Sequence, residues 1–531
     1  MKNISNMKAN GVIYTPAWIV DLILNNLNYT VNIETKKIID PACGDGAFLT
    51  AILGRFIKSA KENKRSNEEI KTLIKNNIFG WDIDEDAIKK CKIKLDLVAK
   101  EFGLENITWN LIVTNSLNKN FCNIYFNYFD FVVGNPPYIR IQNLEKEKRN
   151  YIQKEWLLCK SGSTDIYLAF FELGYFLLKK DGLFGFITPN TYLKTSAGKD
   201  LRLFIKQKNI LDTLIDFEHH QIFDNATTYV LITILNKEHQ EKYFKLYKGN
   251  SSKEIEFVDN IDLKNLNDEN WILASNKILE KVNIIEKKGI PLSRIAEIHV
   301  GITTLADEYY IFKNPTIKDK MAIINLKDGR KFEIEKDILK PIVKVSVLKN
   351  ANEEQNRFII FPYKKVKGKH QIIPEDELKN KYPLTYGYFT QIKDILSARD
   401  KGKPNPLCWY AFGRSQGLDT SFGGKILTSP INLKPKFIVW NKNDYTFYAG
   451  YCIKYQGDLN WLADILNSYD MEFYIKTISR NYQNNYKSFA KSFIRNFSIE
   501  IKDNAYFKKN NQDKKNNQDK KNNQEILLNY Y

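Results

Sequence analysis

Short β-branched and aromatic runs alternate with helical patterns through the first 235 residues, and this alternation restricts the fold more than any other feature. Three helical patterns are clear: one from Ala47 to Ala60, one that begins at Glu85 and one from Asp165 to Lys179. The runs predict seven strands, at 37–40, 77–82, 107–113, 130–134, 183–188, 210–217 and 227–235. Strands separated by helices are typical of a doubly wound α/β sheet, which binds ligands beyond the carboxyl ends of its strands.

The pattern changes after this region. Residues 237–288 are polar and irregular, and short aromatic-rich strands without clear helical alternation begin near Ile290. We therefore expect a first domain over 1–240, a linker over 241–289 and a second, mostly β or α+β domain over 290–505. The tail, 506–531, repeats Asn-Asn-Gln-Asp-Lys-Lys without an apolar face, which predicts disorder.

The charge balance is strongly basic, with 80 Lys and Arg against 62 Asp and Glu, a net charge of +18. Such an excess favours a polyanionic partner, nucleic acid or an acidic membrane surface. A lysine-rich bias in an AT-rich gene would produce the same excess, so the charge by itself is a weak indication of function.

The cysteines and the hydropathy pattern indicate the compartment. The 6 Cys form no C-x-x-C pair, and the 5 His do not lie at metal-ligand spacing from them. Scattered cysteines of this kind predict reduced, structural thiols and no metal site. The polar start of the chain predicts no signal peptide, and no run reaches the ~18 apolar residues that span a bilayer. We expect a cytoplasmic protein.

A rigid loop rich in hydrogen-bond acceptors, Asn135-Pro136-Pro137-Tyr138, follows the fourth expected strand. The asparagine side-chain oxygen and the next carbonyl can both accept hydrogen bonds, and the two prolines stiffen the turn without adding N–H donors. Tyr138 adds a flat ring. This combination favours a planar substrate that carries an NH2 group. The alternative is a rigid turn around a buried asparagine.

A glycine-rich loop, Asp40-Pro41-Ala42-Cys43-Gly44-Asp45-Gly46, follows the first expected strand. Glycines at this point let a ligand approach the backbone at the start of a helix, although the loop lacks the G-x-G-x-x-G pattern of dinucleotide sites. Asp82 ends the second strand, where a carboxylate can accept hydrogen bonds from two ribose hydroxyls, and Ile83 can pack on an adenine face. The alternative is an ordinary glycine turn.

Taken in order, these motifs resemble the γ-class, TaqI-like family of N6-adenine DNA methyltransferases. The resemblance runs from Gly11 to Leu235 and, more weakly, into the C-terminal part; besides the two loops and Asp82, it is carried by residues 11–16, 165–167, 185–190 and 223–228. It implies a Rossmann-like class I methyltransferase fold with a mixed seven-stranded sheet. It also implies S-adenosylmethionine as cofactor, double-stranded DNA as substrate and a catalytic domain over 1–240.

The resemblance assigns roles to individual residues. Catalysis falls to Asn135, Pro136 and Tyr138. Phe223 stands where the family stacks an aromatic ring on the target base opposite Tyr138, with core packing as the alternative. Asn115 stands where the family usually has an aspartate facing the cofactor's adenine, a departure that affects affinity. The implied cofactor contacts are Tyr14, Thr15, Pro16, Asp40, Ala42, Gly44, Asp82, Ile83, Asn115, Ser116, Asn135 and Pro137.

The implied reaction methylates the N6 amine of an adenine that has left the duplex. The Asn135 oxygen and the Pro136 carbonyl would hold the two amine hydrogens. N4-cytosine methylation is a rival, since cytosine also carries an exocyclic amine, although that class usually has Ser before Pro-Pro. Glutamine methyltransferases of release factors share the tetrapeptide but are much shorter. A binding-only specificity subunit would not need cofactor motifs.

The basic, aromatic C-terminal part, 290–505, fits a target-recognition domain. Its most distinctive segment, 409–418, contains Arg414 and Gln416, side chains suited to guanine and adenine edges. The alternative for Arg414 is a phosphate contact or a structural salt bridge. The first motif begins at Gly11, so we expect any cognate restriction endonuclease, against which methylation would protect, to be a separate protein.

Overall fold

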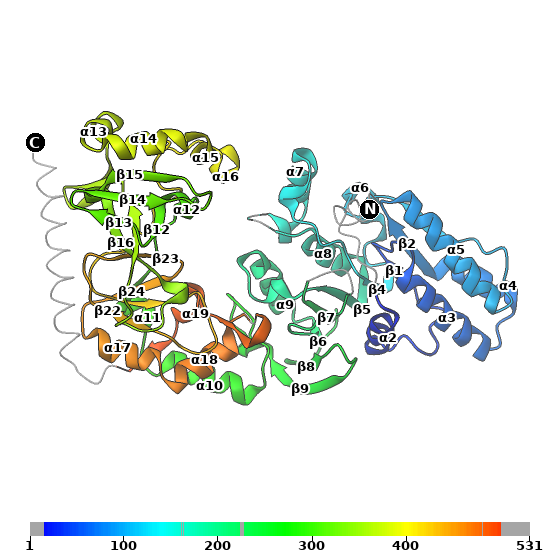
Figure 1. The fold of residues 1–531 in the computed structure, drawn as a ribbon. Coiled ribbons are helices and arrows are strands. Elements are labelled where there is room, and N and C mark those ends of the chain that lie inside the picture. Colours follow the sequence, from blue (N-terminus) through cyan, green and yellow to red (C-terminus); the bar gives the residue numbers. More distant parts are fainter. Residues whose placement is uncertain (1–14, 161, 163, 224–227, 481, 501–531) are drawn as a thin grey trace, which may run out of the picture. The chain divides into compact units, whose positions relative to one another are not determined.

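The computed structural model describes residues 15–160, 162, 164–223, 228–480 and 482–500. Tyr14 and the repetitive tail lie outside the described residues. The chain forms two compact units, Met1–Glu280 and Lys281–Tyr531 (Figure 1). Each unit has its own sheets and its own apolar clusters.

A nine-stranded mixed sheet forms the framework of the first unit, in the order β3-β2-β1-β4-β5-β7-β6-β8-β9. Strands β3, β2, β1, β4 and β5 pair in parallel with one another, whereas β7 is antiparallel to both β5 and β6. The bounds are β1 (Ile38–Asp40), β2 (Ile78–Asp82), β3 (Asn110–Val113), β4 (Phe129–Gly134), β5 (Leu178–Pro189), β6 (Leu211–Asp216), β7 (Val230–Asn236), β8 (Tyr243–Gly249) and β9 (Ile255–Asp262). The seven expected strands all form, and the α/β prediction is confirmed.

The sheet has two strands more than the expected seven. β8 pairs in parallel with β6, and β9 pairs antiparallel with β8. Both lie in the segment 241–289, which was expected to be a linker but instead extends the sheet. Phe244 and Leu246 alternate with exposed neighbours and are fully buried, so a half-buried strand is present here. The surrounding lysines and the polar composition hide this short alternation in the sequence.

Helices cover both faces of the sheet. Adjacent strand residues point to opposite faces, so Ile38 and Val133 belong to one apolar cluster and Ile39 and Val132 to the other. The first cluster includes α2 (Ala17–Asn26), α3 (Ala47–Glu62), α4 (Asn67–Asn77) and α5 (Glu85–Glu101). The second includes α7 (Lys146–Glu155), α8 (Tyr167–Leu177) and α9 (Lys199–Lys208), and the short helix α6 (Lys119–Cys122) adds Cys122 to it.

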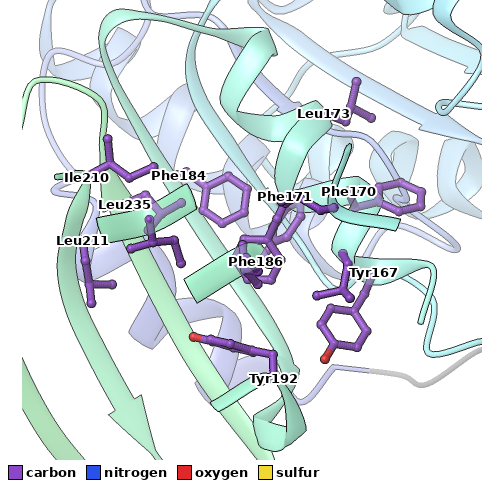
Figure 2. Packing of buried hydrophobic residues seen from close by; sticks show 14 of the residues in the cluster. Tyr167, Phe170, Phe171, Leu173, Phe184, Phe186, Tyr192, Ile210, Leu211 and Leu235 are labelled. Carbon is purple, nitrogen blue, oxygen red and sulfur yellow. The ribbon is translucent and has the colours of Figure 1, made fainter. Parts of the chain in front are cut away.

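Helix α8 is apolar on almost every side because it lies inside the unit. Figure 2 shows Phe171 of this helix against Phe184 and Phe186 of β5, with ring centroids 5.3 and 5.9 Å from that of Phe171. A Cβ at Gly174 would lie 2.4 Å from the Phe184 ring, so glycine permits this close approach. Burial of each such phenylalanine contributes about 1.5–3 kcal/mol, and the helix thereby fixes β4 and β5, which flank the candidate site.

The second unit combines several small sheets with short helices. Its larger sheets have the orders β11-β24-β20-β22, β12-β17-β16-β23 and β13-β14-β15. The strands are β10 (Ile290–Pro291), β11 (Ala296–Val300), β12 (Ile311–Lys313), β13 (Thr316–Lys318), β14 (Met321–Asn325), β15 (Lys331–Glu335), β16 (Leu339–Lys344), β17 (Arg357–Ile360), β18 (Tyr363–Val366), β19 (Lys369–Ile372), β20 (Lys425–Thr428), β21 (Ile431–Asn432), β22 (Ile438–Trp440), β23 (Thr446–Tyr448), β24 (Tyr451–Tyr455), β25 (Lys487–Ser488) and β26 (Ser498–Ile499).

The helices of the second unit are mostly short. They are α11 (Leu292–Ile295), α12 (Asp307–Tyr310), α13 (Glu375–Lys381), α14 (Pro383–Gln391), α15 (Lys393–Ser397), α16 (Arg399–Gly402), α17 (Leu459–Leu466), α18 (Tyr469–Ile478) and α19 (Lys491–Ile494). Helix α10 (Asn276–Lys287) contains the boundary between the units, at Glu280. The boundary therefore falls inside a helix, near the end of the segment expected to be a linker.

Within the described residues, no helix has both the length and the apolar character to cross a membrane. The same residues contain no group of three or more His, Cys, Asp or Glu side chains placed to hold a metal ion. All six cysteines are free thiols, and five of them are buried.

Candidate active site

The carboxyl ends of three neighbouring parallel strands bring the predicted motifs together. β1 pairs with β2 on one side and with β4 on the other, so Asp40, Asp82 and Gly134 end adjacent strands at one edge of the sheet. The glycine-rich loop follows β1 and the loop that begins at Asn135 follows β4. This edge is where doubly wound sheets bind ligands, and the expected proximity of the motifs is present.

Asp40 is buried between the two loops. Its side chain is 2% exposed, and its Oδ1 accepts a hydrogen bond from the Ala42 N–H at 3.0 Å. A Cβ at Gly134 would lie 2.6 Å from Asp40 Oδ1, so glycine is required where β4 passes this carboxyl group. Burial, with a smaller contribution from the negative charge of Asp82, raises the pKa of Asp40 to about 8. A cation bound beside Asp40 would lower that pKa again.

Asp82 links the end of β2 to the glycine-rich loop. Its Oδ2 accepts from the Gly44 N–H at 2.8 Å and its Oδ1 from the Asp84 N–H at 2.9 Å. Gly44 has a φ of +53°, and a Cβ there would meet nothing within 4 Å. Each carboxylate oxygen retains a lone pair for a ligand hydroxyl. The neighbouring Ile83 side chain is 70% exposed and available to cover a flat ring.

Asn115 and Ser116 lie on the loop after β3. Ser116 is buried, and its hydroxyl donates to the Pro41 carbonyl at 2.6 Å, which fixes this loop against the glycine-rich loop. Asn115 is exposed, and its Oδ1 accepts from the Leu117 N–H at 3.1 Å. The Asn115 amide is therefore oriented by the backbone, with its NH2 group directed away from Leu117.

The loop after β4 is tied to a distant part of the chain. Asn135 Nδ2 donates to Thr15 Oγ1 at 3.0 Å, across 120 residues of sequence. Thr15 belongs to the N-terminal segment expected to bind the cofactor, and the next residue, Pro16, precedes α2. The hydrogen bond orients the amide, because the Asn135 carbonyl oxygen must then face away from Thr15.

Tyr138 is held by one hydrogen bond and one ring contact. The hydroxyl donates to the Ile187 carbonyl at 3.2 Å, and the ring makes an edge-on contact with Tyr167, with centroids 6.3 Å apart. Burial raises the pKa of Tyr138 well above its usual value, so the phenol is neutral. A ring fixed in this way can offer one face to a planar ligand without first losing side-chain entropy.

Phe223 lies in the core. Its side chain is 2% exposed and belongs to the apolar cluster against which Tyr138 also packs. The structure thus has Phe223 in the core-packing arrangement that the sequence left open, with its ring covered. Residues 224–227, which follow it, lie outside the described residues.

The two recognition candidates lie in the second unit. Arg414 forms a salt bridge with Asp400 at 3.1 Å, and Gln416 Nε2 donates to Thr303 Oγ1 at 3.4 Å. The salt-bridge alternative for Arg414 is therefore present. Its side chain nevertheless remains 48% exposed.

Comparison with known families gives a match within the first unit. Residues 76–223 match the family described as Eco57I restriction-modification methylase. The chain carries a restriction-modification methylase domain. The matched range contains Asp82, Asn115 and the loop at Asn135, so most of the candidate site lies within it.

Related proteins extend the likeness beyond the methylase domain. The type II restriction enzyme and methyltransferase RM.Eco57I of Escherichia coli is 29% identical over 77% of this chain and 48% of its own length. The type II methyltransferase M.BstVI of Geobacillus stearothermophilus is 26% identical over 87% of this chain and 84% of its own. The chain thus spans about half of the first relative, and the resemblance to restriction-modification methyltransferases is confirmed.

A solved structure shares the fold. The type IIL restriction-modification enzyme MmeI, solved in complex with DNA, has a TM-score of 0.58 and 13% identity. The match covers 90% of this chain and 64% of MmeI. Since the identity is low, the comparison establishes only the fold.

The sequence did not predict two contacts that support the candidate site. The first is the bond between Thr15 and Asn135, and the second is the Tyr167 ring beside Tyr138. The segment after Tyr138 also bonds to the start of α8, where the Ile166 N–H donates to the Ile139 carbonyl at 2.8 Å. The sequence did contain a signal for the contacts at Ile166 and Tyr167. The motif Asp165-Ile166-Tyr167 occurs in the order that the resemblance predicts, although no role was assigned to it.

Proposed function

We propose that this protein is a site-specific DNA methyltransferase that methylates the exocyclic N6 amine of adenine in duplex DNA, with S-adenosylmethionine as methyl donor. One observation carries the proposal: the acceptor-rich loop at Asn135 lies inside the matched methylase domain and is hydrogen-bonded to Thr15 of the expected cofactor segment. The modification would protect DNA against a cognate restriction endonuclease.

The residues at the sheet edge fit the cofactor. Asp82 is held by two backbone N–H groups with acceptor capacity to spare for ribose hydroxyls, and exposed Ile83 can cover the adenine. Asp40, near the Asn135 loop, can lose its proton to balance a positive charge. Ala42, Gly44, Asn115, Ser116 and Pro137 complete the proposed pocket, with Tyr14, Thr15 and Pro16 at the methionine end. Bound S-adenosylmethionine supplies a methyl group carried on a positively charged sulfur.

Tyr138 provides the surface for the target base. Extrusion of a base costs a few kcal/mol, and stacking on one aromatic ring returns about 1–3 kcal/mol. The bond from the Tyr138 hydroxyl to Ile187 fixes the ring before the base arrives. Phe223 would stack on the opposite face only after its apolar neighbours move, since its ring is covered.

Asn135 and Pro136 then act on the amine. In free adenine the N6 lone pair is delocalised into the ring, which makes the nitrogen a poor nucleophile. Hydrogen bonds from the two amine hydrogens to the Asn135 oxygen and the Pro136 carbonyl favour a more tetrahedral nitrogen and localise the lone pair. Acceptors that are held in place before the amine arrives require little reorganisation during the reaction.

The second unit is the proposed target-recognition domain, over the expected range 290–505. The M.BstVI match covers 87% of this chain, and thus includes part of this unit. A methyltransferase must find one sequence among many, and base edges in the major groove carry that information. Duplex DNA is the proposed partner of both units.

One assay tests the proposal. The protein is incubated with isotope-labelled S-adenosylmethionine and unmethylated plasmid DNA, and the DNA is digested to nucleosides and analysed by mass spectrometry. We expect labelled N6-methyldeoxyadenosine. Detection of labelled N4-methyldeoxycytidine would identify cytosine, and not adenine, as the target base. Labelled protein with unlabelled DNA would overturn the proposal.

A further inference from the structure

A cavity of about 740 Å³ lies in the second unit, lined by the turn at 399–407 and by the segment 409–415. Three of its charged residues are cationic, Arg399, Lys403 and Arg414, and one, Asp400, is anionic. Four of the five Arg399 N–H donors are bonded to backbone carbonyls, so Arg414 and Lys403 are the lining cations with more donors left for a ligand. A positively charged hollow suits the electronegative edge of a nucleic acid.

The Arg414 guanidinium is paired in a specific way. Nη1 and Nη2 donate to the two Asp400 oxygens at 3.1 and 3.2 Å, an end-on pair, and Nη1 also donates to the Gly413 carbonyl at 2.9 Å. A guanidinium has five N–H donors, so the Nε–H and the second Nη2–H remain. Among the residues that the structure describes, no partner is recorded for either. These two hydrogens lie along one edge of the guanidinium and form a fork.

We propose that Arg414 reads a guanine of the DNA target through this fork and that Asp400 is the positioning residue that aims it. Guanine presents N7 and O6 side by side in the major groove, and a bidentate arginine is the commonest contact to them. The inference rests on the proposed function, because it gives the recognition unit one specific base. A phosphate could also accept the fork, but a phosphate carries no sequence information.

The turn that carries Asp400 is fixed by its surroundings. Asp400 and Lys401 have φ values of +52° and +61°, and Gly402 follows at +77°. Two adjacent non-glycine residues in this region are costly and persist only where neighbouring structure holds them. Arg399 stabilises this turn, because its guanidinium donates to four backbone carbonyls at 2.8–3.0 Å. These are the carbonyls of Leu396, Thr304, Ala411 and Trp409.

Arg414 is anchored through its own backbone as well. Its N–H donates to the Thr303 carbonyl at 3.1 Å, and the Thr303 hydroxyl accepts from Gln416 Nε2 at 3.4 Å. Both members of the ion pair therefore start from fixed backbone positions. A side chain held in its binding geometry loses less entropy on binding and discriminates more sharply between bases.

The test compares recognition motifs. Wild type, Arg414→Lys, Asp400→Asn and the control Asp328→Asn each methylate a random-sequence DNA library, and single-molecule sequencing gives the preference at each position. Asp328 forms an exposed pair with Arg330 in the same unit, outside the cavity lining. Thermal melting shows whether each variant folds.

We expect a guanine, on either strand, at one position of the wild-type motif. Arg414→Lys should lower the preference for it roughly 5- to 150-fold, because lysine keeps the charge but lacks the fork. Asp400→Asn should lower it at the same position by about 2- to 5-fold, with other positions unchanged. Asp328→Asn should leave the motif unaltered.

Three results would overturn the inference. One is a wild-type motif without guanine, and another is a motif that Asp400→Asn leaves intact in a folded protein. The third is a uniform loss at all sequences in Arg414→Lys with a weaker salt dependence, which would indicate a phosphate contact. If wild type methylates no DNA at all, the proposed function itself fails, a distinct outcome.

Discussion

The two units hold their candidate functional side chains in different ways. In the first unit, Asn135 and Tyr138 are oriented by neutral hydrogen bonds to Thr15 and Ile187 at the edge of a large sheet. In the second, Arg414 is oriented by an exposed ion pair on a strained turn between short elements. A buried sheet edge holds its side chains rigidly. Residues of surface loops and exposed ion pairs, in contrast, can be substituted without disturbing a core. The difference matches the proposed division into a catalytic unit and a recognition unit.

The largest effect should come from Asn135→Ala. Without the amide oxygen the target amine loses one of its two acceptors, and methyl transfer should fall by about 10³-fold. Cofactor affinity, measured by calorimetry, should change little. Asn120→Ala, at an exposed position of the short helix α6, serves as control and should retain activity. Wild-type turnover in Asn135→Ala would remove the catalytic half of the comparison.

A second prediction concerns the pH dependence of the free energy of unfolding. Asp40 ionises near 3.8 when unfolded and near 8 when folded, so the folded protein takes up a proton between these values. The free energy of unfolding should therefore fall as pH rises from 4 to 8, by up to about 1.4 kcal/mol per pH unit. The slope should be less steep in Asp40→Asn than in wild type, measured by urea denaturation of the two proteins side by side.

Asp400 provides the matched control for this pH effect. The Arg414 guanidinium lowers the pKa of the Asp400 carboxyl, so that group stays ionised throughout the same range. Asp400→Asn should thus reproduce the wild-type slope between pH 5 and 8. Equal slopes in wild type and Asp40→Asn would show that Asp40 does not titrate as its burial implies.

The smallest effect should come from Thr15→Val. The substitution keeps the shape of Thr15 and removes only the hydroxyl that accepts from Asn135. Loss of one such hydrogen bond costs about 0.5–1.5 kcal/mol, so methyl transfer should fall about 2- to 10-fold in steady-state assays. Thr15→Ser retains the hydroxyl and should remain near wild type. If valine and serine behave alike, the bond does not orient the Asn135 amide.

The sequence predicted the first unit well because its signals are local. Each of the seven expected strands is a short apolar run, and each loop motif sits directly after one of them. β8 was missed since its alternation, with Phe244 and Leu246 inward, is brief and surrounded by lysines. No break in the sequence pattern marks the unit boundary at Glu280, because α10 continues through it.

The sequence alone determined the motif order, the α/β alternation and the residue types at the sheet edge, because these depend on neighbours in the chain. Only the tertiary structure decided which side chains meet: Thr15 with Asn135, Tyr138 with Tyr167, and Asp400 with Arg414. It also decided that the Phe223 ring is covered. Such contacts arise when strand pairing and core packing bring distant segments together, and no local pattern in the chain encodes the partner.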